Sequence, residues 1–234
     1  MIFWKVFSSE DGFGLVEIAV ALVIMGLIMG GILKGYTLVE NARLRTVIAQ
    51  INEYRMAAHG FYDRYGALPG DYDKASQYIQ PELWDGDNDG FIRGGGLESR
   101  SGSVREAVSF WAHLSGAGFI SDTGKPLSGA HATFGKGAPK SKMGGGMTIE
   151  MDPVGTDLKG LWFILGAENG PHGNKGLLTP AQAMSLDQAD DDGNPETGWI
   201  RAREGAGTPA GNCVKNGAYN GSVKDPACVL YFQF

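Results

Sequence analysis

Apolar residues fill one long stretch near the amino terminus and then recur at helical spacing. Between Phe13 and Leu33 the chain has 21 residues, and Glu17 is the only charged one. A helix needs about 20 apolar residues to cross a bilayer. Further on, apolar residues continue at intervals of three and four as far as Tyr65, which is typical of an amphipathic helix. We therefore expect one helix from Phe13 to Tyr65, membrane-spanning as far as Leu33.

The remaining residues, 66–234, alternate short helical and strand-like patterns. Residues 103–120 carry apolar side chains at helical spacing, and Thr179, Pro180 and Gln182 form the pattern of a capped helix start. Short β-rich runs bounded by glycine or proline occupy residues 146–153, 160–167, 198–204 and 228–234. These patterns predict an α+β globular head with short helices and a small antiparallel sheet.

Composition narrows the function classes. The formal net charge is −6 and no long basic run occurs, so nucleic-acid binding has no electrostatic support. Glycine contributes 37 of the 234 residues, roughly twice its usual share, and these glycines cluster after residue 85. No G-X-Y period accompanies them, so collagen is excluded and a loop-rich head is expected.

Two simple interpretations compete for the amino-terminal stretch. A cleavable secretory signal has an apolar core of about 7–15 residues and a small-x-small cleavage site. Here the apolar run is longer, and "LKGYTLVEN" offers no such site. A plain membrane anchor explains the length but not the acid, because a carboxylate inside a membrane helix costs roughly 2.5–3.5 kcal/mol. It also leaves Gly12 and Phe13 unexplained.

The run "GFGLVE" over residues 12–17, followed by the apolar stretch, resembles the class III signal of type IV prepilins and type II secretion pseudopilins. The resemblance implies that residues 1–12 are a leader, which prepilin peptidase removes between Gly12 and Phe13. It implies N-methylation of Phe13 and makes Glu17 the fifth mature residue. In such filaments this glutamate faces the amino group of a neighbouring subunit, which offsets the cost of burying its charge.

The leader also departs from the family pattern, in which basic residues precede the glycine. Lys5 is its only cation, while Glu10 and Asp11 directly precede the cleavage position. The positive-inside rule then favours a cytoplasmic leader only through Lys5 and the free amino terminus. The resemblance further implies the pilin-like lollipop architecture, with the helix over 13–65 followed by a head over 66–234.

An alternating acidic loop suggests a calcium site. Asp85, Asp87 and Asp89 are followed by Gly90, as in the first half of a calcium-binding loop. The twelfth position is Gly96 instead of a bidentate glutamate, which excludes a complete EF-hand. We hypothesise a calcium site completed by more distant oxygens, such as those of Glu98 or a backbone carbonyl. A turn rich in Asp and Gly is the alternative.

A second acidic stretch contains Asp187, Asp190, Asp191 and Asp192 beside another turn. Its spacing matches a metal loop less well, so we interpret it as a solvated turn that caps a helix. An aspartate from this stretch could instead meet a metal or a basic residue.

Cys213 and Cys228 are the chain's two cysteines. Oxidising compartments favour a disulfide, worth roughly 3 kcal/mol for a loop of this length. The pair also resembles the carboxy-terminal disulfide loop of many type IV pilins, and two buried free thiols are the alternative.

No pattern points to catalysis. His59, His113, His131 and His172 are scattered, without the spacing H-E-x-x-H, and neither G-x-x-x-x-G-K-[ST] nor G-x-S-x-G occurs. We interpret the histidines as surface or satisfied core residues and do not expect an enzyme.

The sequence thus favours a structural subunit, a minor pilin or pseudopilin, of a type IV pilus or a type II secretion filament. We expect it as a single-pass protein of the bacterial inner membrane with its head in the periplasm, and later in a periplasmic or extracellular filament. Its expected partners are prepilin peptidase, other pilin or pseudopilin subunits and the inner-membrane assembly platform. The alternative is a non-polymerising, membrane-anchored calcium-binding adhesin or receptor. An anchored periplasmic enzyme ranks third.

Overall fold

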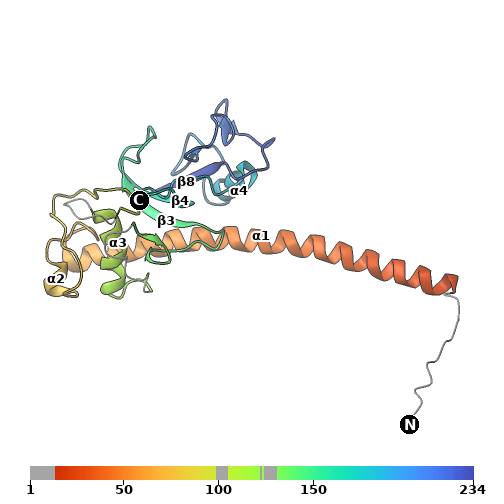
Figure 1. Cartoon of the computed structure of the whole chain (residues 1–234), viewed down its shortest axis with the longest axis horizontal. Coiled ribbons are helices and arrows are strands. Elements are labelled where there is room, and N and C mark those ends of the chain that lie inside the picture. Colours follow the sequence, from red (N-terminus) through yellow and green to blue (C-terminus); the bar gives the residue numbers. More distant parts are fainter. Residues whose placement is uncertain (1–13, 99–104, 122, 124–130) are drawn as a thin grey trace, which may run out of the picture. The chain divides into compact units, whose positions relative to one another are not determined.

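A computed structural model describes residues 14–98, 105–121, 123 and 131–234 of the chain (Figure 1). Two compact units are distinguished, one ending at Ala42 and the other running from Arg43 to Phe234. The elements in chain order are α1 (Leu15–Tyr65), α2 (Ala75–Tyr78), α3 (Glu106–Gly116), β1 (Thr133–Phe134), β2 (Gly137–Ala138), β3 (Gly146–Met151), β4 (Leu161–Gly166), α4 (Pro180–Asp190), β5 (Ile200–Glu204), β6 (Val214–Lys215), β7 (Ala218–Tyr219) and β8 (Cys228–Gln233).

The long helix expected from the apolar pattern is confirmed as α1. It ends at Tyr65 because Gly66 adopts a φ of 74°, a left-handed conformation that glycine accepts without strain. In the second unit, α1 buries one stripe of side chains spaced by three and four residues. This stripe consists of Leu44, Val47, Ile51, Tyr54, Ala58 and Phe61.

The strands predicted in the head form a four-stranded antiparallel sheet in the order β3-β4-β8-β5. Strand β4 lies inside the sheet, and all six of its residues are buried, which explains its continuous apolar sequence. The α+β head with a small antiparallel sheet is therefore confirmed.

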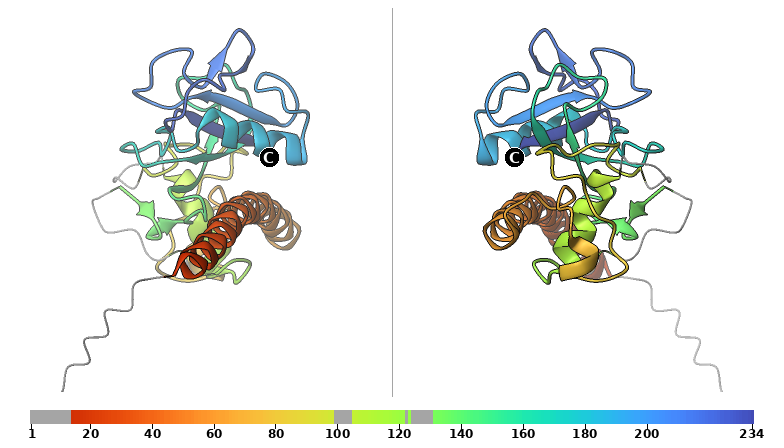
Figure 2. Two further views of the ribbon diagram at one scale, coloured as in Figure 1. Left: turned by 90° about the vertical axis from the view of Figure 1, so that its right-hand side faces the viewer. Right: turned by 90° about the vertical axis from the view of Figure 1, so that its left-hand side faces the viewer.

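One face of the sheet meets α3 and the second half of α1, and both helices lie on the same side of it (Figure 2). Aromatic rings fill this core. Trp111 of α3 lies 5.1 Å from Tyr54 of α1 and 6.0 Å from Phe163 of β4, measured between ring centroids. The opposite face carries a smaller apolar cluster of Leu158, Trp162, Ile164, Val229 and Tyr231.

Helix α4 starts as the sequence predicts. The Thr179 hydroxyl accepts the Gln182 N–H at 3.2 Å, and the Gln182 side chain accepts the Thr179 N–H at 3.0 Å. This reciprocal capping box satisfies two of the free N–H groups at the helix start. Pro180 occupies the first turn, where its missing N–H costs nothing.

The predicted disulfide between Cys213 and Cys228 is present and joins the segment before β6 to the first residue of β8. Three short features were not anticipated: helix α2, the parallel pair β1–β2 and the hairpin β6–β7. The hairpin turns at Asn216 and Gly217, both with positive φ, as a tight two-residue turn requires.

Candidate functional site

The first part of α1 is apolar on all sides. Its apolar 18-residue window has a mean hydropathy of 2.5, and none of it is buried within the structure. Among the described residues, α1 is the one helix long and apolar enough to cross a membrane. The large exposed side chains in this part include Leu15, Val16, Ile18, Leu22, Leu27 and Ile32. Such a surface requires a lipid or protein environment, since water does not stabilise it.

Glu17 lies in the first turn of α1. Its Oε2 accepts the N–H of Gly14 at 2.8 Å, so it satisfies one of the free donors at the helix start. A negative charge here also interacts favourably with the helix dipole. Local capping therefore explains how the side chain is oriented, without explaining why an acid stands in an apolar run. Gly12 and Phe13, the predicted cleavage residues, lie outside the described residues.

The loop predicted to bind calcium forms a different acidic group from the one expected. Carboxylate oxygens of Asp71, Asp87 and Asp89 lie within 4.8 Å of one another. Asp85 does not belong to this group, because its carboxylate accepts the N–H and the hydroxyl of Ser76, both at 2.7 Å. Asp71 therefore stands in place of Asp85 in this group of neighbouring carboxylates, whereas the predicted calcium ligands were Asp85, Asp87 and Asp89; calcium binding by the loop stays a prediction.

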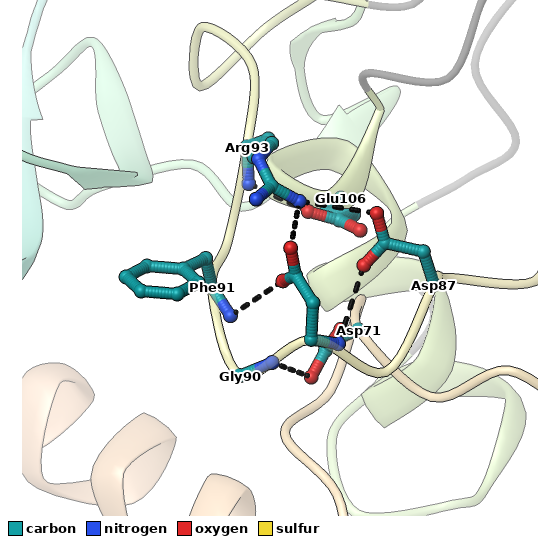
Figure 3. A network of polar contacts seen from close by, with 7 residues as sticks. Asp71, Asp87, Gly90, Phe91, Arg93 and Glu106 are labelled. Atoms are coloured by element: carbon teal, nitrogen blue, oxygen red, sulfur yellow. Dashed lines mark hydrogen bonds and ion pairs between the residues drawn. The ribbon is translucent and has the colours of Figure 1, made fainter.

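Asp71 is brought to the loop by a turn that precedes it. Its two carboxylate oxygens accept the N–H groups of Asp89 and Gly90, each at 3.0 Å (Figure 3). Burial raises the pKa of Asp71, and these two hydrogen bonds oppose that effect. Its position after Gly70 in "LPGD", a glycine with a φ of 90°, marks a turn but gives no indication of the partner loop.

A single arginine neutralises part of this group. The Arg93 guanidinium lies 3.0 Å from Asp87 and also pairs with Asp89 (Figure 3). Beneath it, Glu106 of α3 is 4% exposed, and its Oε2 accepts the Arg93 N–H at 2.7 Å. Burial raises the pKa of Glu106 to about 7, with further contributions from the charges of Asp87 and Asp71. Arg93 therefore contacts three acids, Asp87 and Asp89 through its guanidinium and Glu106 through its backbone N–H.

Gly96, at the twelfth position of the loop, is needed for close packing. The N–H of Gly96 donates to Glu150 at 2.7 Å, and a Cβ at Gly96 would overlap the Thr148 side chain. Glu98, proposed from the sequence as an additional ligand, lies with its Oε1 3.6 Å from His131. Neither residue belongs to the group formed by the loop aspartates.

The second acidic stretch also contains three neighbouring carboxylates, those of Asp187, Asp191 and Asp192. Protein donors already occupy them. Buried Asp187 accepts the Gly193 N–H at 3.0 Å and the Tyr219 hydroxyl at 2.6 Å. The other two accept backbone or hydroxyl donors from the turn over residues 194–200. These contacts support the interpretation of this stretch as a structural turn.

His113 links the acidic loop to the core. Its Nδ1 accepts the Gly70 N–H at 2.9 Å, so its Nε2–H donates to the Trp84 carbonyl, 2.7 Å away. Burial lowers the pKa of His113 to about 4, so the imidazole is neutral near pH 7. The side chain fixes the turn before Asp71 and the start of the acidic loop against α3. It is a satisfied core histidine, as the sequence indicated.

In comparisons with known proteins, no family model, no curated protein and no solved structure matches this chain. Membership of the prepilin family stays a prediction that rests on residues 12–17 and the apolar run after them.

Proposed function

We propose that this chain is a structural subunit, a pilin or pseudopilin, of a filament of the type IV pilus or type II secretion class, which polymerises through α1 after leader cleavage. One observation carries the proposal: the first part of α1 is apolar and exposed on every side, and its single charged residue, Glu17, stands in the first turn. A receptor anchor needs the apolar surface but has no use for the acid.

The chemistry of Glu17 favours a filament. Cleavage after Gly12 would create an α-ammonium group on Phe13, four residues before Glu17. When the helix leaves the membrane and packs among other helices, an unpaired carboxylate would be costly, whereas an ammonium group of a neighbouring subunit compensates it. The pair then fixes how one helix aligns with the next. N-methylation of Phe13 belongs to the same proposal.

The proposal also implies where the protein is located and which proteins it contacts. Before assembly the chain crosses the bacterial inner membrane once, with its head in the periplasm, and prepilin peptidase removes residues 1–12. The assembly platform of the inner membrane and other pilin or pseudopilin subunits then take it into the filament. The disulfide between Cys213 and Cys228 is consistent with an oxidising compartment for the head.

The test compares three full-length proteins in a bacterium that assembles the filament: wild type, Glu17→Ala and Glu17→Gln. We expect all three to be processed and inserted, and both variants to be depleted from the sheared filament fraction by about tenfold or more. Leu22→Ala, which removes an apolar side chain from the same helix without touching the acid, serves as the matched control. Equal recovery of Glu17→Ala and wild type in that fraction would contradict the proposal.

Calcium binding by the loop is a separate proposal. Asp71, Asp87 and Asp89 offer oxygen ligands of the kind that calcium prefers, and loop carbonyls can supplement them. Each of these carboxylates already accepts at least one backbone N–H of the loop, and Arg93 pairs with two of them. A bound cation must therefore displace the guanidinium and share oxygens with these N–H groups. We therefore expect weak affinity in the wild type and tighter binding when the competing cation is removed.

Calcium titration of the full-length protein in detergent tests this proposal through the melting temperature of the head. Calcium should raise that temperature, Asp87→Ala should abolish the rise, and Arg93→Gln should lower the calcium concentration that produces it. Asp85→Asn serves as the control, because Asp85 bonds to Ser76 outside the group. The absence of any calcium response in both wild type and Arg93→Gln would end the proposal.

A further inference from the structure

Two exposed regions of the head carry opposite charge. Residues 63–93 contain seven acids and three bases, whereas residues 134–144 contain three lysines and no acid. Both regions belong to the unit that runs from Arg43 to Phe234. We name the first the acidic end, represented by exposed Asp63, Asp73 and Glu82, and the second the basic flank, represented by exposed Lys136, Lys140 and Lys142.

Contacts with α1 place the two regions at different heights along this helix. In the acidic end, the Tyr72 ring lies 5.2 Å from that of Tyr65, the last residue of α1. In the basic flank, the Lys140 carbonyl accepts a hydrogen bond from the Gln50 side chain at 3.3 Å. Gln50 and Tyr65 are separated by 15 positions, and at 1.5 Å per residue the two heights differ by about 22 Å.

The representative side chains are available for a partner. Among the described residues, no ion pair involves any of the three lysines of the basic flank or Asp63, Asp73 and Glu82. Exposed Arg43 lies seven positions before Gln50, which puts it on the same helix face and extends the basic flank. Two nearby acids partly offset this charge. Glu53 lines a hollow together with Lys140, and exposed Glu168 accepts the N–H of Phe134 at 2.8 Å.

The acidic end has a net negative charge, although some of its acids pair with nearby cations. Arg93 pairs with both Asp87 and Asp89 but offsets only one of their two charges. Lys74 and Arg64 stand next to Asp73 and Asp63 in the chain, and Arg105 lies 4.3 Å from the Trp84 ring. Glu82 has no cation beside it in sequence, and Asp85 is held by neutral donors of Ser76. The surface is therefore mixed but negative in sum, and it can be recognised by a surface rich in lysine.

We propose that the acidic end of one head docks on the basic flank of a second copy of this chain, shifted along the helix axis by about 20 Å. Glu17 and Phe13 are four residues apart, about 6 Å along a helix, so the docked copy is a different neighbour from the one whose ammonium group meets Glu17. The inference rests on the proposed filament function. If two copies lay at the same height, the acidic end of one would lie level with the acidic end of the other, and the two basic flanks would also lie level. A shift equal to the distance between the two regions instead places an acidic end level with a basic flank. Charge complementarity of this kind selects one register and disfavours others.

A second copy explains both regions, because the two complementary surfaces occur on every chain and can repeat along a filament. An anionic lipid surface would satisfy the basic flank alone and would leave the acidic end without a partner. We therefore assign the basic flank to subunit contact, and binding to lipid becomes an outcome that the test distinguishes.

Charge exchange in the full-length chain tests the inference. Reversal of the basic flank, Lys136→Glu with Lys140→Glu and Lys142→Glu, should reduce recovery in the sheared filament fraction by about tenfold, and high salt should weaken wild-type filaments. Adding Asp63→Lys, Asp73→Lys and Glu82→Lys to that variant should restore recovery. A control with the same change of net charge is Lys159→Glu with Lys215→Glu and Lys224→Glu, in exposed positions elsewhere.

Cysteine cross-linking gives a second readout, since both native cysteines are already joined in the disulfide. Glu82→Cys together with Lys140→Cys on one chain should yield a ladder of multimers on mild oxidation, because each copy contacts two others. Each single variant should stay largely monomeric. Dimers from either single variant would show copies at equal height and would overturn the inference.

The outcomes separate this inference from the function on which it rests. If wild type itself forms no filament, the proposed function fails first. If wild type assembles and the reversed basic flank assembles equally well, or if the charge exchange restores nothing, only the docking of the two regions is refuted. Loss of binding to anionic vesicles by the reversed variant, with unchanged assembly, would reassign the basic flank to lipid.

Discussion

Replacement of Glu106 by Gln probes the acidic loop through the pH dependence of stability. The pKa of Glu106 is raised by burial from 4.5 to about 7 in the folded protein. Between these two values the folded chain holds a proton that the unfolded chain has released, so the free energy of unfolding falls as pH rises. At about 1.4 kcal/mol per pH unit, the loss approaches about 3 kcal/mol. Glutamine keeps an acceptor for the backbone N–H of Arg93 but has no proton that titrates in this pH range.

The wild-type profile alone hides this effect. Burial lowers the pKa of His113 from 6.5 to about 4, so His113 costs stability on acidification, in the opposite direction and over nearly the same range. Subtracting the wild-type stability profile from that of Glu106→Gln removes the contribution of His113 and of every other group that the two proteins share. We expect Glu106→Gln to gain about 3 kcal/mol relative to wild type between pH 4.5 and about 7.

Urea unfolding of the full-length proteins in detergent, followed by near-ultraviolet circular dichroism of the buried aromatic core, measures this difference. Glu82→Gln, which removes an exposed acid from the same region, is the matched control. A difference profile for Glu106→Gln that stays flat across this range would refute the assignment of a buried, proton-holding carboxyl beneath Arg93.

Two further predictions concern the stability of the head. Thr179→Ala should lower the free energy of unfolding by about 1 kcal/mol because the capping box at α4 loses its acceptor, whereas Thr179→Ser should nearly retain it; equal losses would exclude the hydroxyl as the cause. Replacement of Cys213 and Cys228 by Ser should cost about 3 kcal/mol in the same urea assay, and an unchanged midpoint would contradict a disulfide that restrains the unfolded chain.

Elements specified by neighbouring residues could be predicted from the sequence. The period of apolar residues up to Tyr65, followed by Gly66, determines where α1 ends. The spacing of Thr179, Pro180 and Gln182 determines where α4 starts. In both cases the interactions lie within one or two helical turns, so local pattern and structure agree.

The acidic loop could not be predicted in the same way, because its geometry depends on distant contacts. Gly86 and Asn88 donate their N–H groups to the carbonyls of Tyr72 and Asp71, at 2.9 Å each. This pairing brings Asp71 to the loop. Asp85 is drawn away to Ser76 instead. Alternation of acids along the chain identified a loop in which carboxylates gather, but it could not show which three lie together.

The mass of the amino-terminal peptide tests the central claim most directly. The protein purified from membranes or from a sheared filament fraction is digested, and its first peptide is identified by mass spectrometry. The filament account predicts a peptide that begins at Phe13 and carries an N-methyl group. A mature protein that begins at Met1 would contradict it and would favour the anchored, non-polymerising adhesin or receptor.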